Sequence, residues 1–244
     1  MGKPLLYVIV ALLLLQSTRL EAQESCQGKH GAFAGLELKG VGDASRSDSV
    51  DILHTRIALD LTQVGNNVIQ AVTTVRLAPK VNGIDQVVFD LLALTVDSVV
   101  HNGSALAFNQ AGEALNISLG GTYDPSDTLQ LTIFYQGDPV VDASGWGGFY
   151  TSGGVIYNLG VAFDSQPHSF GRAWFPCFDN FVERSSYEFI ILTDQSRHAW
   201  CTGLLVNETD LGAGRFESHW KLEETIPSYL ANVTASTYVA VRDT

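Results

Sequence analysis

The residue types that perform hydrolysis are present in this sequence, but they do not stand in the spacings that hydrolysis requires. Many zinc hydrolases place two histidines one helical turn apart around a glutamate, as His-Glu-x-x-His, so that both imidazoles face the metal. The six histidines here are dispersed, and none is followed by a glutamate. The sequence also contains no Gly-x-Ser-x-Gly turn, no phosphate-binding glycine loop and no Cys-x-x-Cys pair. We therefore expect no metal ligands and no catalytic residues in this chain.

Two pairs of carboxylates have the residue types of a glycosidase site. Asp124 and Asp127 stand in Tyr-Asp-Pro-Ser-Asp, a composition typical of a turn in which Asp and Ser side chains bond to nearby backbone amides. Glu223 and Glu224 are adjacent, so in an extended strand they point to opposite faces and cannot share a substrate atom. Both pairs therefore favour a structural role.

The segment from Gly145 to Asp179 is unusually rich in glycine and aromatic residues. Glycine permits positive φ and close backbone approach, and each aromatic ring can bury on the order of 150 to 250 Å². Two interpretations remain open for this segment. It is either a loop fixed to the core by aromatic anchors or a wall that faces a ligand.

The end of that segment carries a family signature. Arg-Ala-Trp-Phe-Pro-Cys-Phe-Asp, from Arg172 to Asp179, resembles the Arg-x-x-Phe-Pro-Cys-Phe-Asp signature of the zinc aminopeptidases typified by aminopeptidase N and leukotriene A4 hydrolase. Gly-Gly-Phe-Tyr before it and Pro-Ser-Tyr-Leu after it are also similar to that family, and the likeness covers about Val50 to Val241. The positions that match the signature, for which the family implies a structural role, are Arg172, Phe175, Pro176, Cys177, Phe178 and Asp179.

The resemblance implies an N-terminal, saddle-shaped β-sandwich domain that caps the active-site cleft of a catalytic domain. In that family Gly-x-Met-Glu-Asn, His-Glu-x-x-His, a more distant glutamate ligand and a transition-state tyrosine all lie in the catalytic domain. This sequence stops at Thr244 before any of them. We therefore expect no cofactor in this chain, zinc in the missing catalytic domain, and no cleavage of peptides by this chain alone. The expected partner is that domain, in the same polypeptide or encoded nearby.

The resemblance also implies one substrate-binding residue. The family places a Glu or Gln, often followed by Pro, before the signature, and its side chain helps to hold the free α-amino group of a peptide substrate. Gln166-Pro167 matches this pattern, although its spacing to Arg172 is one residue longer than the family's commoner spacing. A glutamine amide oxygen accepts a hydrogen bond from an ammonium group but brings no charge. The alternative is a loop glutamine that faces solvent.

The elements that would position these residues are β-strands. From about Val50 onward, short runs of alternating apolar and polar residues are separated by turn residues, and no amphipathic helix of three turns follows the first 22 residues. The sequence thus predicts one all-β domain over residues 50–244, a saddle-like β-sandwich of about a dozen mostly antiparallel strands. The predicted strands are 53–61, 68–78, 86–90, 94–101, 105–108, 114–119, 129–135, 187–193, 199–206, 214–222 and 229–241, with turns available at Asp194-Gln195 and Asn207-Glu208.

The N-terminus has the pattern of an export signal. Lys3 precedes an uninterrupted apolar run from Leu5 to Leu15, and Leu20-Glu-Ala22 ends in a small residue suited to cleavage. The run has eleven residues, whereas about 20 are needed to cross a bilayer, so we expect a cleaved signal peptide over residues 1–22, an irregular segment over 23–49, and no transmembrane anchor. The chain is then secreted or periplasmic. Its four Asn-x-Ser/Thr sequons would be glycan acceptors only where the machinery exists.

Charge and cysteine content restrict the partners further. The formal net charge is −12, which repels phosphate backbones at long range, so nucleic acid is not an expected partner. Export would permit a disulfide between Cys177 and Cys201, but two separate buried thiols fit the sequence equally well. A second functional interpretation stays open: a free-standing secreted β-sandwich that binds a peptide, a glycan or a protein.

Overall fold

The computed structural model describes residues 45–66 and 68–239. The predicted signal peptide, the irregular segment up to residue 44 and the end of the last predicted strand lie outside the described residues. Nearly all of the described secondary structure is β-strand. The helical elements are one-turn pieces, namely α2 (Arg46–Ser49), η1 (Val64–Asn66), η2 (Gly171–Ala173) and η3 (Ser228–Leu230).

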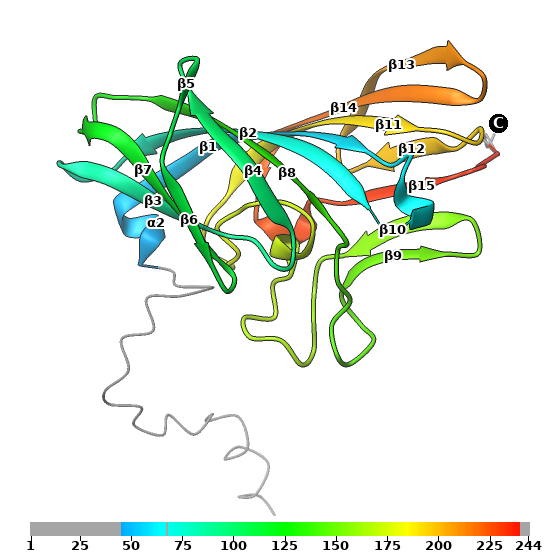
Figure 1. Cartoon of the computed structure of the whole chain (residues 1–244), viewed down its shortest axis with the longest axis horizontal. Helices are drawn as coiled ribbons and strands as arrows, with labels where there is room; N and C mark the ends of the chain where they lie inside the picture. Colours follow the sequence, from blue (N-terminus) through cyan, green and yellow to red (C-terminus); the bar gives the residue numbers. More distant parts are fainter. Residues whose placement is uncertain (1–44, 67, 240–244) are drawn as a thin grey trace, which may run out of the picture. The chain divides into compact units, whose positions relative to one another are not determined.

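One eight-stranded sheet forms the larger layer (Figure 1). Among the described strands, β1 and β11 form the parallel pair of this sheet, and its other ladders are antiparallel. Across the sheet the strands are β13 (Leu204–Gly212), β14 (Arg215–Ile226), β11 (Ser185–Thr193), β1 (Val50–Asp60), β2 (Ile69–Pro79), β8 (Leu129–Gly137), β4 (Thr95–His101) and β5 (Ser104–Ala105).

Two smaller antiparallel sheets lie on one side of the large sheet (Figure 1). Buried residues of all three sheets, such as Ile57, Phe89 and Ile156, belong to one hydrophobic cluster, so the layers share a core. The fold prediction of an all-β sandwich with mostly antiparallel strands is therefore confirmed. The smaller sheets are β12 (His198–Cys201), β15 (Val233–Ser236), β10 (Val155–Leu159) and β9 (Gly148–Ser152), and β3 (Ile84–Asp90), β7 (Ala114–Tyr123) and β6 (Phe108–Ala111).

The strand alternation follows from burial of one face, but one detail of β1 differs from the prediction. In β1, Thr55, Ile57 and Leu59 are buried as expected, whereas Leu53 is only partly buried because the pairing register with β2 shifts between Ile52 and His54. A bulge inserts one residue and reverses the side that each preceding residue faces. In β2 the buried set is Ile69, Ala71, Thr73, Val75, Leu77 and Pro79.

Other predicted strands and one predicted turn differ from the structure, and one hairpin was not predicted. The predicted strand 105–108 is two strands, β5 and β6, in different sheets, and 199–206 is likewise divided between β12 and β13. Asn207 and Glu208 lie within β13 and do not form a turn. The described part of 229–241 contains only η3 and the short β15. The glycine-rich segment, which was not assigned strands, forms the hairpin β9–β10.

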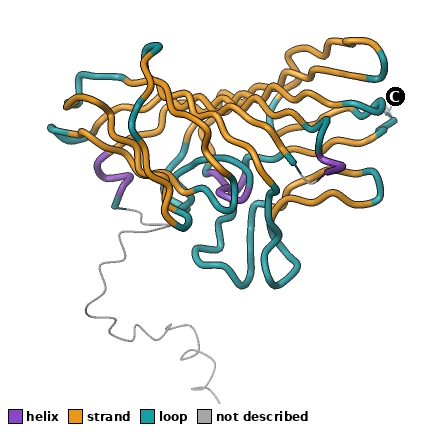
Figure 2. The backbone as a smooth tube through the Cα atoms, viewed as in Figure 1, coloured by secondary structure: helices purple, strands orange, loops and turns teal. Residues whose placement is uncertain are grey.

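Two long loops project from the side of the small sheets (Figure 2). The first spans residues 138–147 between β8 and β9, and the second spans residues 160–170 between β10 and η2. Within the described part of the chain, no helix has the length and apolar character needed to span a membrane.

Candidate functional site

The two loops are tied together by one carboxylate, that of Asp142 in the 138–147 loop. Its oxygens accept hydrogen bonds from the backbone N–H groups of Phe163 (3.3 Å), Asp164 (3.0 Å) and Ser165 (2.9 Å) in the 160–170 loop. The hydroxyls of Ser144 and Ser165 donate to the same carboxylate. Burial raises the pKa of Asp142, but these hydrogen bonds outweigh it and hold the pKa well below its ordinary value. Asp142 is thus an ionised clamp between the loops.

The clamp places two exposed aromatic rings against each other. Trp146 and Phe163, one from each loop, stack with ring centroids 5.9 Å apart and planes within 6°. Their relative exposures are 51% and 61%, which is high for side chains that could bury a large apolar area. Of the two interpretations of the glycine- and aromatic-rich segment, this pair supports a wall that faces outward, whereas Phe149, Trp174 and Phe175 are buried anchors.

Arg172 of the signature fixes the other end of the 160–170 loop. Its guanidinium is almost fully buried and donates to the backbone carbonyls of Pro167 (3.3 Å) and Ser169 (2.5 Å). It also forms ion pairs with Asp179 and Glu113, each at 2.8 Å. Burial lowers the pKa of Arg172, but the two carboxylates more than compensate and raise it. A buried, permanently charged group therefore holds the backbone that follows Gln166.

Asp179, at the end of the signature, forms hydrogen bonds with residues at its beginning. Its carboxylate accepts hydrogen bonds from the backbone N–H groups of Gly171 (3.1 Å) and Arg172 (3.3 Å) and from the hydroxyl of Ser228 (2.8 Å) in η3. Its own backbone N–H donates to Asp90 (2.9 Å). These contacts satisfy the buried charge, as a buried ion requires. The signature and the Pro-Ser-Tyr-Leu segment thus form one hydrogen-bonded unit.

The Asp90 carboxylate extends this buried network toward the first residues of the fold. Arg46 in α2 forms an ion pair with it at 2.6 Å, and its guanidinium lies 4.9 Å from the ring centroid of Phe178. Asp90 also exchanges two backbone hydrogen bonds with Cys177 of the signature. Neither Arg46 nor Asp90 could be identified from the sequence, because neither stands near the signature.

Gln166 lies between Ser165, whose backbone N–H is bound by Asp142, and Pro167, whose carbonyl is bound by Arg172, and its side chain is exposed. Its Nε2 lies 3.0 Å from Nε2 of His168, whose Nδ1 lies 2.9 Å from the backbone carbonyl of Ala162. Because a carbonyl can only accept, His168 Nδ1 carries the proton and Nε2 accepts from the Gln166 amide. The amide nitrogen is then occupied and the oxygen Oε1 points elsewhere as an acceptor. The Gln166–Pro167 peptide bond is cis.

The remaining signature residues pack into the core. Phe175 contacts Trp174 and Tyr187 edge-on, with ring centroids 4.7 and 6.2 Å away, and Phe178 packs on Phe89. Of the two alternatives for the cysteines, the structure shows separate thiols: Cys177 is buried, Cys201 is partly buried, and both are free. Burial raises the pKa of both thiols, which disfavours the reactive thiolate.

The carboxylate pairs do not form a catalytic site. The Asp127 carboxylate accepts from the backbone N–H of Asp124 at 2.8 Å, and the backbone N–H of Asp127 donates back to the Asp124 carbonyl, which confirms the predicted turn. Glu223 forms an exposed ion pair with Lys221 at 2.6 Å. Among the described residues, no three His, Cys, Asp or Glu side chains are grouped as metal ligands.

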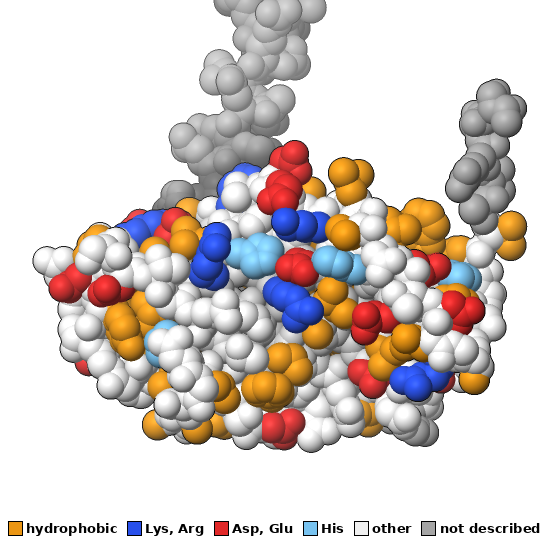
Figure 3. Space-filling view, turned by 90° about the horizontal axis from the view of Figure 1, so that it is seen from above, with side chains coloured by type: hydrophobic (Ala, Val, Ile, Leu, Met, Phe, Trp, Pro, Cys, Tyr) orange, Lys and Arg blue, Asp and Glu red, His pale blue; other side chains and the backbone are white. Residues whose placement is uncertain are grey.

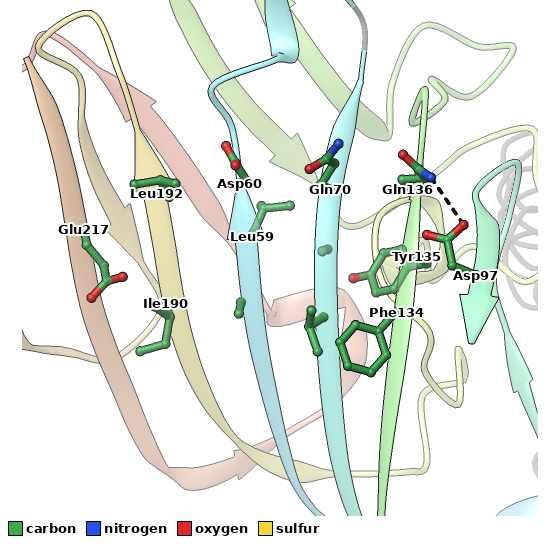
Figure 4. Close-up of a pocket in the computed structure, with 13 residues that line it drawn as sticks. Leu59, Asp60, Gln70, Asp97, Phe134, Tyr135, Gln136, Ile190, Leu192 and Glu217 are labelled. Carbon is green, nitrogen blue, oxygen red and sulfur yellow. Dashed lines mark hydrogen bonds between the residues drawn. The ribbon is translucent and has the colours of Figure 1, made fainter. Parts of the chain in front are cut away.

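The outer face of the eight-stranded sheet carries other polar features. Figure 3 shows histidine, basic and acidic side chains gathered on this face, where Glu188 pairs with His219 (2.8 Å), Arg56 (3.5 Å) and His54 (3.6 Å). Burial lowers the pKa of His54. A hollow of about 500 Å³ lies on the sheet, with Phe134 and Ile190 among its apolar lining residues and Asp60, Asp97 and Glu217 among its acidic ones (Figure 4). These features are contacts between surface side chains and a shallow apolar area, and the described residues of this face show no arrangement of acid, base and nucleophile.

Comparison with known proteins places the fold. The family model described as the peptidase M1 N-terminal domain matches residues 49–230. No curated protein matches the sequence. The solved structures that resemble the chain include an M1 zinc metallopeptidase from Deinococcus radiodurans (TM-score 0.69, 21% identity), a variant of that enzyme bound to a Tyr-Ser-Ala substrate (0.68, 21%), and a two-domain M1 zinc metallopeptidase variant bound to L-tryptophan (0.70, 20%).

The coverage of these comparisons is unequal. The matches cover 77%, 77% and 81% of this chain but only 42%, 42% and 44% of the solved chains. The present chain therefore spans less than half the length of the structures that it resembles.

The residues that sequence reasoning missed are those that hold the loops. Asp142 and Glu113 act through backbone groups or a buried ion that lie 20 or more residues away. No local pattern marks such contacts. A weak signal existed for Phe163, since this aromatic residue directly precedes the polar run Asp164-Ser165-Gln166.

Proposed function

Because the chain belongs to the family of M1 peptidase N-terminal domains, we propose that it is the non-catalytic N-terminal part of a zinc aminopeptidase. In this proposal it caps the active-site cleft of a catalytic domain and helps to bind the N-terminus of a peptide. The observation that carries the proposal is the exposed amide of Gln166, held between two fixed points. Asp142 fixes the loop directly before it and Arg172 fixes the loop directly after it.

The orientation of the amide matches the proposed ligand. His168 accepts the hydrogen bond of the Gln166 Nε2, which leaves Oε1 to accept a hydrogen bond from an α-ammonium group. An oxygen acceptor binds a ligand with an acetylated amine less well, because the acetyl group removes the charge and two of the three donors. Carboxylates on the catalytic domain would supply the charge that the amide lacks.

The metal chemistry of the family belongs to the missing domain. The solved structures that resemble this chain are of zinc metallopeptidases, but the part of this chain that the structure describes contains no set of ligands for zinc. Zinc would polarise the scissile carbonyl and activate water in the catalytic domain. The residues of this chain would bind and orient the peptide N-terminus and restrict access of water to the cleft.

We test substrate binding with peptides. Tyr-Ser-Ala with a free amine and its N-acetyl form are titrated into the purified chain, and binding is followed by amide chemical shifts. We expect the free peptide to bind more tightly, and Gln166→Leu to abolish that preference. The matched control is Gln130→Leu, which changes an exposed glutamine on β8. Equal affinity for the two peptides would refute the role of Gln166.

Export is the second part of the proposal and rests on the apolar run near the N-terminus. The mature protein is purified from its source and its N-terminus is sequenced. We expect it to begin near Gln23. A protein that retains Met1 and the apolar run would refute signal cleavage.

The alternative of a free-standing binding module makes a different prediction about the gene. The transcript is read beyond the codon for Thr244 in the source organism. A segment with Gly-x-Met-Glu-Asn and His-Glu-x-x-His in frame or adjacent supports the aminopeptidase. A stop codon with no such segment nearby favours the binding module.

A further inference from the structure

We propose that the stacked rings of Trp146 and Phe163 form a platform for an aromatic side chain of the peptide whose N-terminus Gln166 binds. This inference rests on the proposed function and adds a substrate class to it, namely peptides with an aromatic residue at or next to the N-terminus. The two rings belong to different loops, and both are more than half exposed.

Hydrogen bonds fix the backbone that carries both rings of the platform. The Asp142 clamp binds the backbone N–H of Phe163 itself and of the next two residues. On the opposite side, the hydroxyl oxygen of Tyr150 lies 3.0 Å from the carbonyl oxygens of both Gly145 and Gly147, which flank Trp146, and its single proton is shared between them. The stacked rings are therefore held before any ligand arrives. Binding to a pre-formed surface avoids the entropic loss of ordering flexible side chains.

The platform and the Gln166 amide are close enough to contact one short peptide. Phe163 and Gln166 are three residues apart, so their Cα atoms are at most about 11 Å apart even if the chain is fully extended. One to three peptide residues cover that distance. A peptide whose ammonium group binds Oε1 of Gln166 can thus place its first or second side chain on the rings.

The chemistry of the platform favours a flat ring. Stacked aromatic pairs contribute about 0.5–1.5 kcal/mol beyond area burial, which corresponds to a change of about two- to tenfold in affinity. An alanine side chain offers neither the area nor the ring. We therefore expect selectivity for aromatic peptides of this modest size.

The experiment compares Tyr-Ser-Ala with Ala-Ser-Ala, both with free amines, on the isotope-labelled full chain. The dissociation constant of each peptide comes from chemical-shift titration, with the indole N–H of Trp146 as a local probe. We expect Tyr-Ser-Ala to bind about two- to tenfold more tightly and to shift that indole signal. In Phe163→Ala and Trp146→Ala the ratio of the two constants should fall to about one.

Trp200→Ala is the matched control, because Trp200 is 46% exposed and contacts Trp220 with ring centroids 5.3 Å apart, but lies on β12 away from the loops. The control should keep the native ratio. Equal binding of both peptides to the native chain would overturn the platform, and so would a native ratio that persists in Phe163→Ala and Trp146→Ala. Binding that depends on the free amine and on Gln166, but not on the aromatic side chain, overturns the platform and leaves the proposed function intact. A preference for tyrosine that survives N-acetylation and Gln166→Leu refutes the role of Gln166 in the proposed function. It also refutes the inference that Gln166 and the platform bind the same peptide.

Discussion

Replacing Arg172 with methionine tests whether the signature is a buried electrostatic network that holds the 160–170 loop. The substitution keeps much of the side-chain volume but removes the charge and all the guanidinium hydrogen bonds. It leaves the Asp179 carboxylate buried at 0% exposure without its ion-pair partner. Breaking a fully buried pair in this way destabilises a protein by about 3–5 kcal/mol.

The lower end of that range applies here. Asp179 keeps hydrogen bonds from two backbone N–H groups and from Ser228, and Glu113 is 34% exposed and can be solvated. We therefore expect a loss of about 3 kcal/mol in the free energy of unfolding, which lowers the Tm by about 6–12 °C in a domain of this size. Urea unfolding and calorimetry measure the two quantities.

Two further variants make the result decisive. Arg56→Met removes an exposed cation, 3.5 Å from Glu188 and 41% exposed, and should change stability by less than about 1 kcal/mol. The double variant Arg172→Met with Asp179→Asn removes both charges, so it should be less destabilised than the sum of the single variants. If Arg172→Met is no worse than Arg56→Met, the reasoning about a buried network is refuted. Where Arg172→Met still folds, peptide binding at Gln166 should also weaken, since the carbonyls of Pro167 and Ser169 lose their donor.

Three further outcomes are expected. Because its hydrogen bonds lower the pKa of Asp142, the clamp should be intact above the ordinary carboxyl pKa of about 4 and should open only as the pH falls through the lowered value. Amide hydrogen exchange of residues 163–165 should therefore stay slow at pH 4 in the native chain and become fast in Asp142→Asn. Gly160→Ala should destabilise the chain by about 1–3 kcal/mol, since the new Cβ would lie 1.9 Å from the Tyr229 carbonyl oxygen, while Gly65→Ala, in open space, should not; equal Tm values would contradict this. A chelator should leave the Tm unchanged, and a large drop would reveal a structural metal.

Strand alternation could be predicted from sequence because burial of one face has a two-residue period. The breaks in strands could not. Only Thr202 and Gly203 separate β12 from β13, and the break lies there because Gly203 takes φ +113° and packs against the Lys221 carbonyl. The split of residues 105–108 has a similar origin, since β5 and β6 pair with strands of different sheets. Such breaks are decided by tertiary partners and leave little local pattern.

The hairpin β9–β10 was missed for a different reason. Its strands have only five residues each and adjoin glycines whose conformational freedom suggests a loop. Gly148 has φ +117°, and a Cβ there would lie 2.3 Å from the Val140 carbonyl oxygen, so glycine permits close packing of strand and loop at this point. A glycine that indicates irregular structure in sequence is here a condition for regular pairing.

The candidate site also has one part that the sequence could predict and another that it could not. Gln166 was found because a family signature follows it, and nothing in its own neighbourhood distinguishes it from a solvent-facing glutamine. The distinction comes from His168, which fixes the amide, and from Asp142, which binds three successive backbone N–H groups of the other loop. Backbone donors have no residue identity, so a contact of this kind cannot be inferred from residue types.

The placement of charge has a consequence for recognition. The ions that fix the loop are buried, namely Arg172 and Asp179, or already bound, as in Asp142, whereas Gln166 and Asp164 are exposed on the loop. A neutral acceptor selects by geometry and by the number of donors, so at short range it orients an ammonium group without holding it tightly. The net charge of −12 acts differently, because it raises the local concentration of cationic ligands at long range and is screened by salt. Long-range attraction by the net charge is thus distinct from short-range orientation by the Gln166 amide. In the proposed function, carboxylates of the catalytic domain add a charged contact to the peptide N-terminus that the Gln166 amide does not supply.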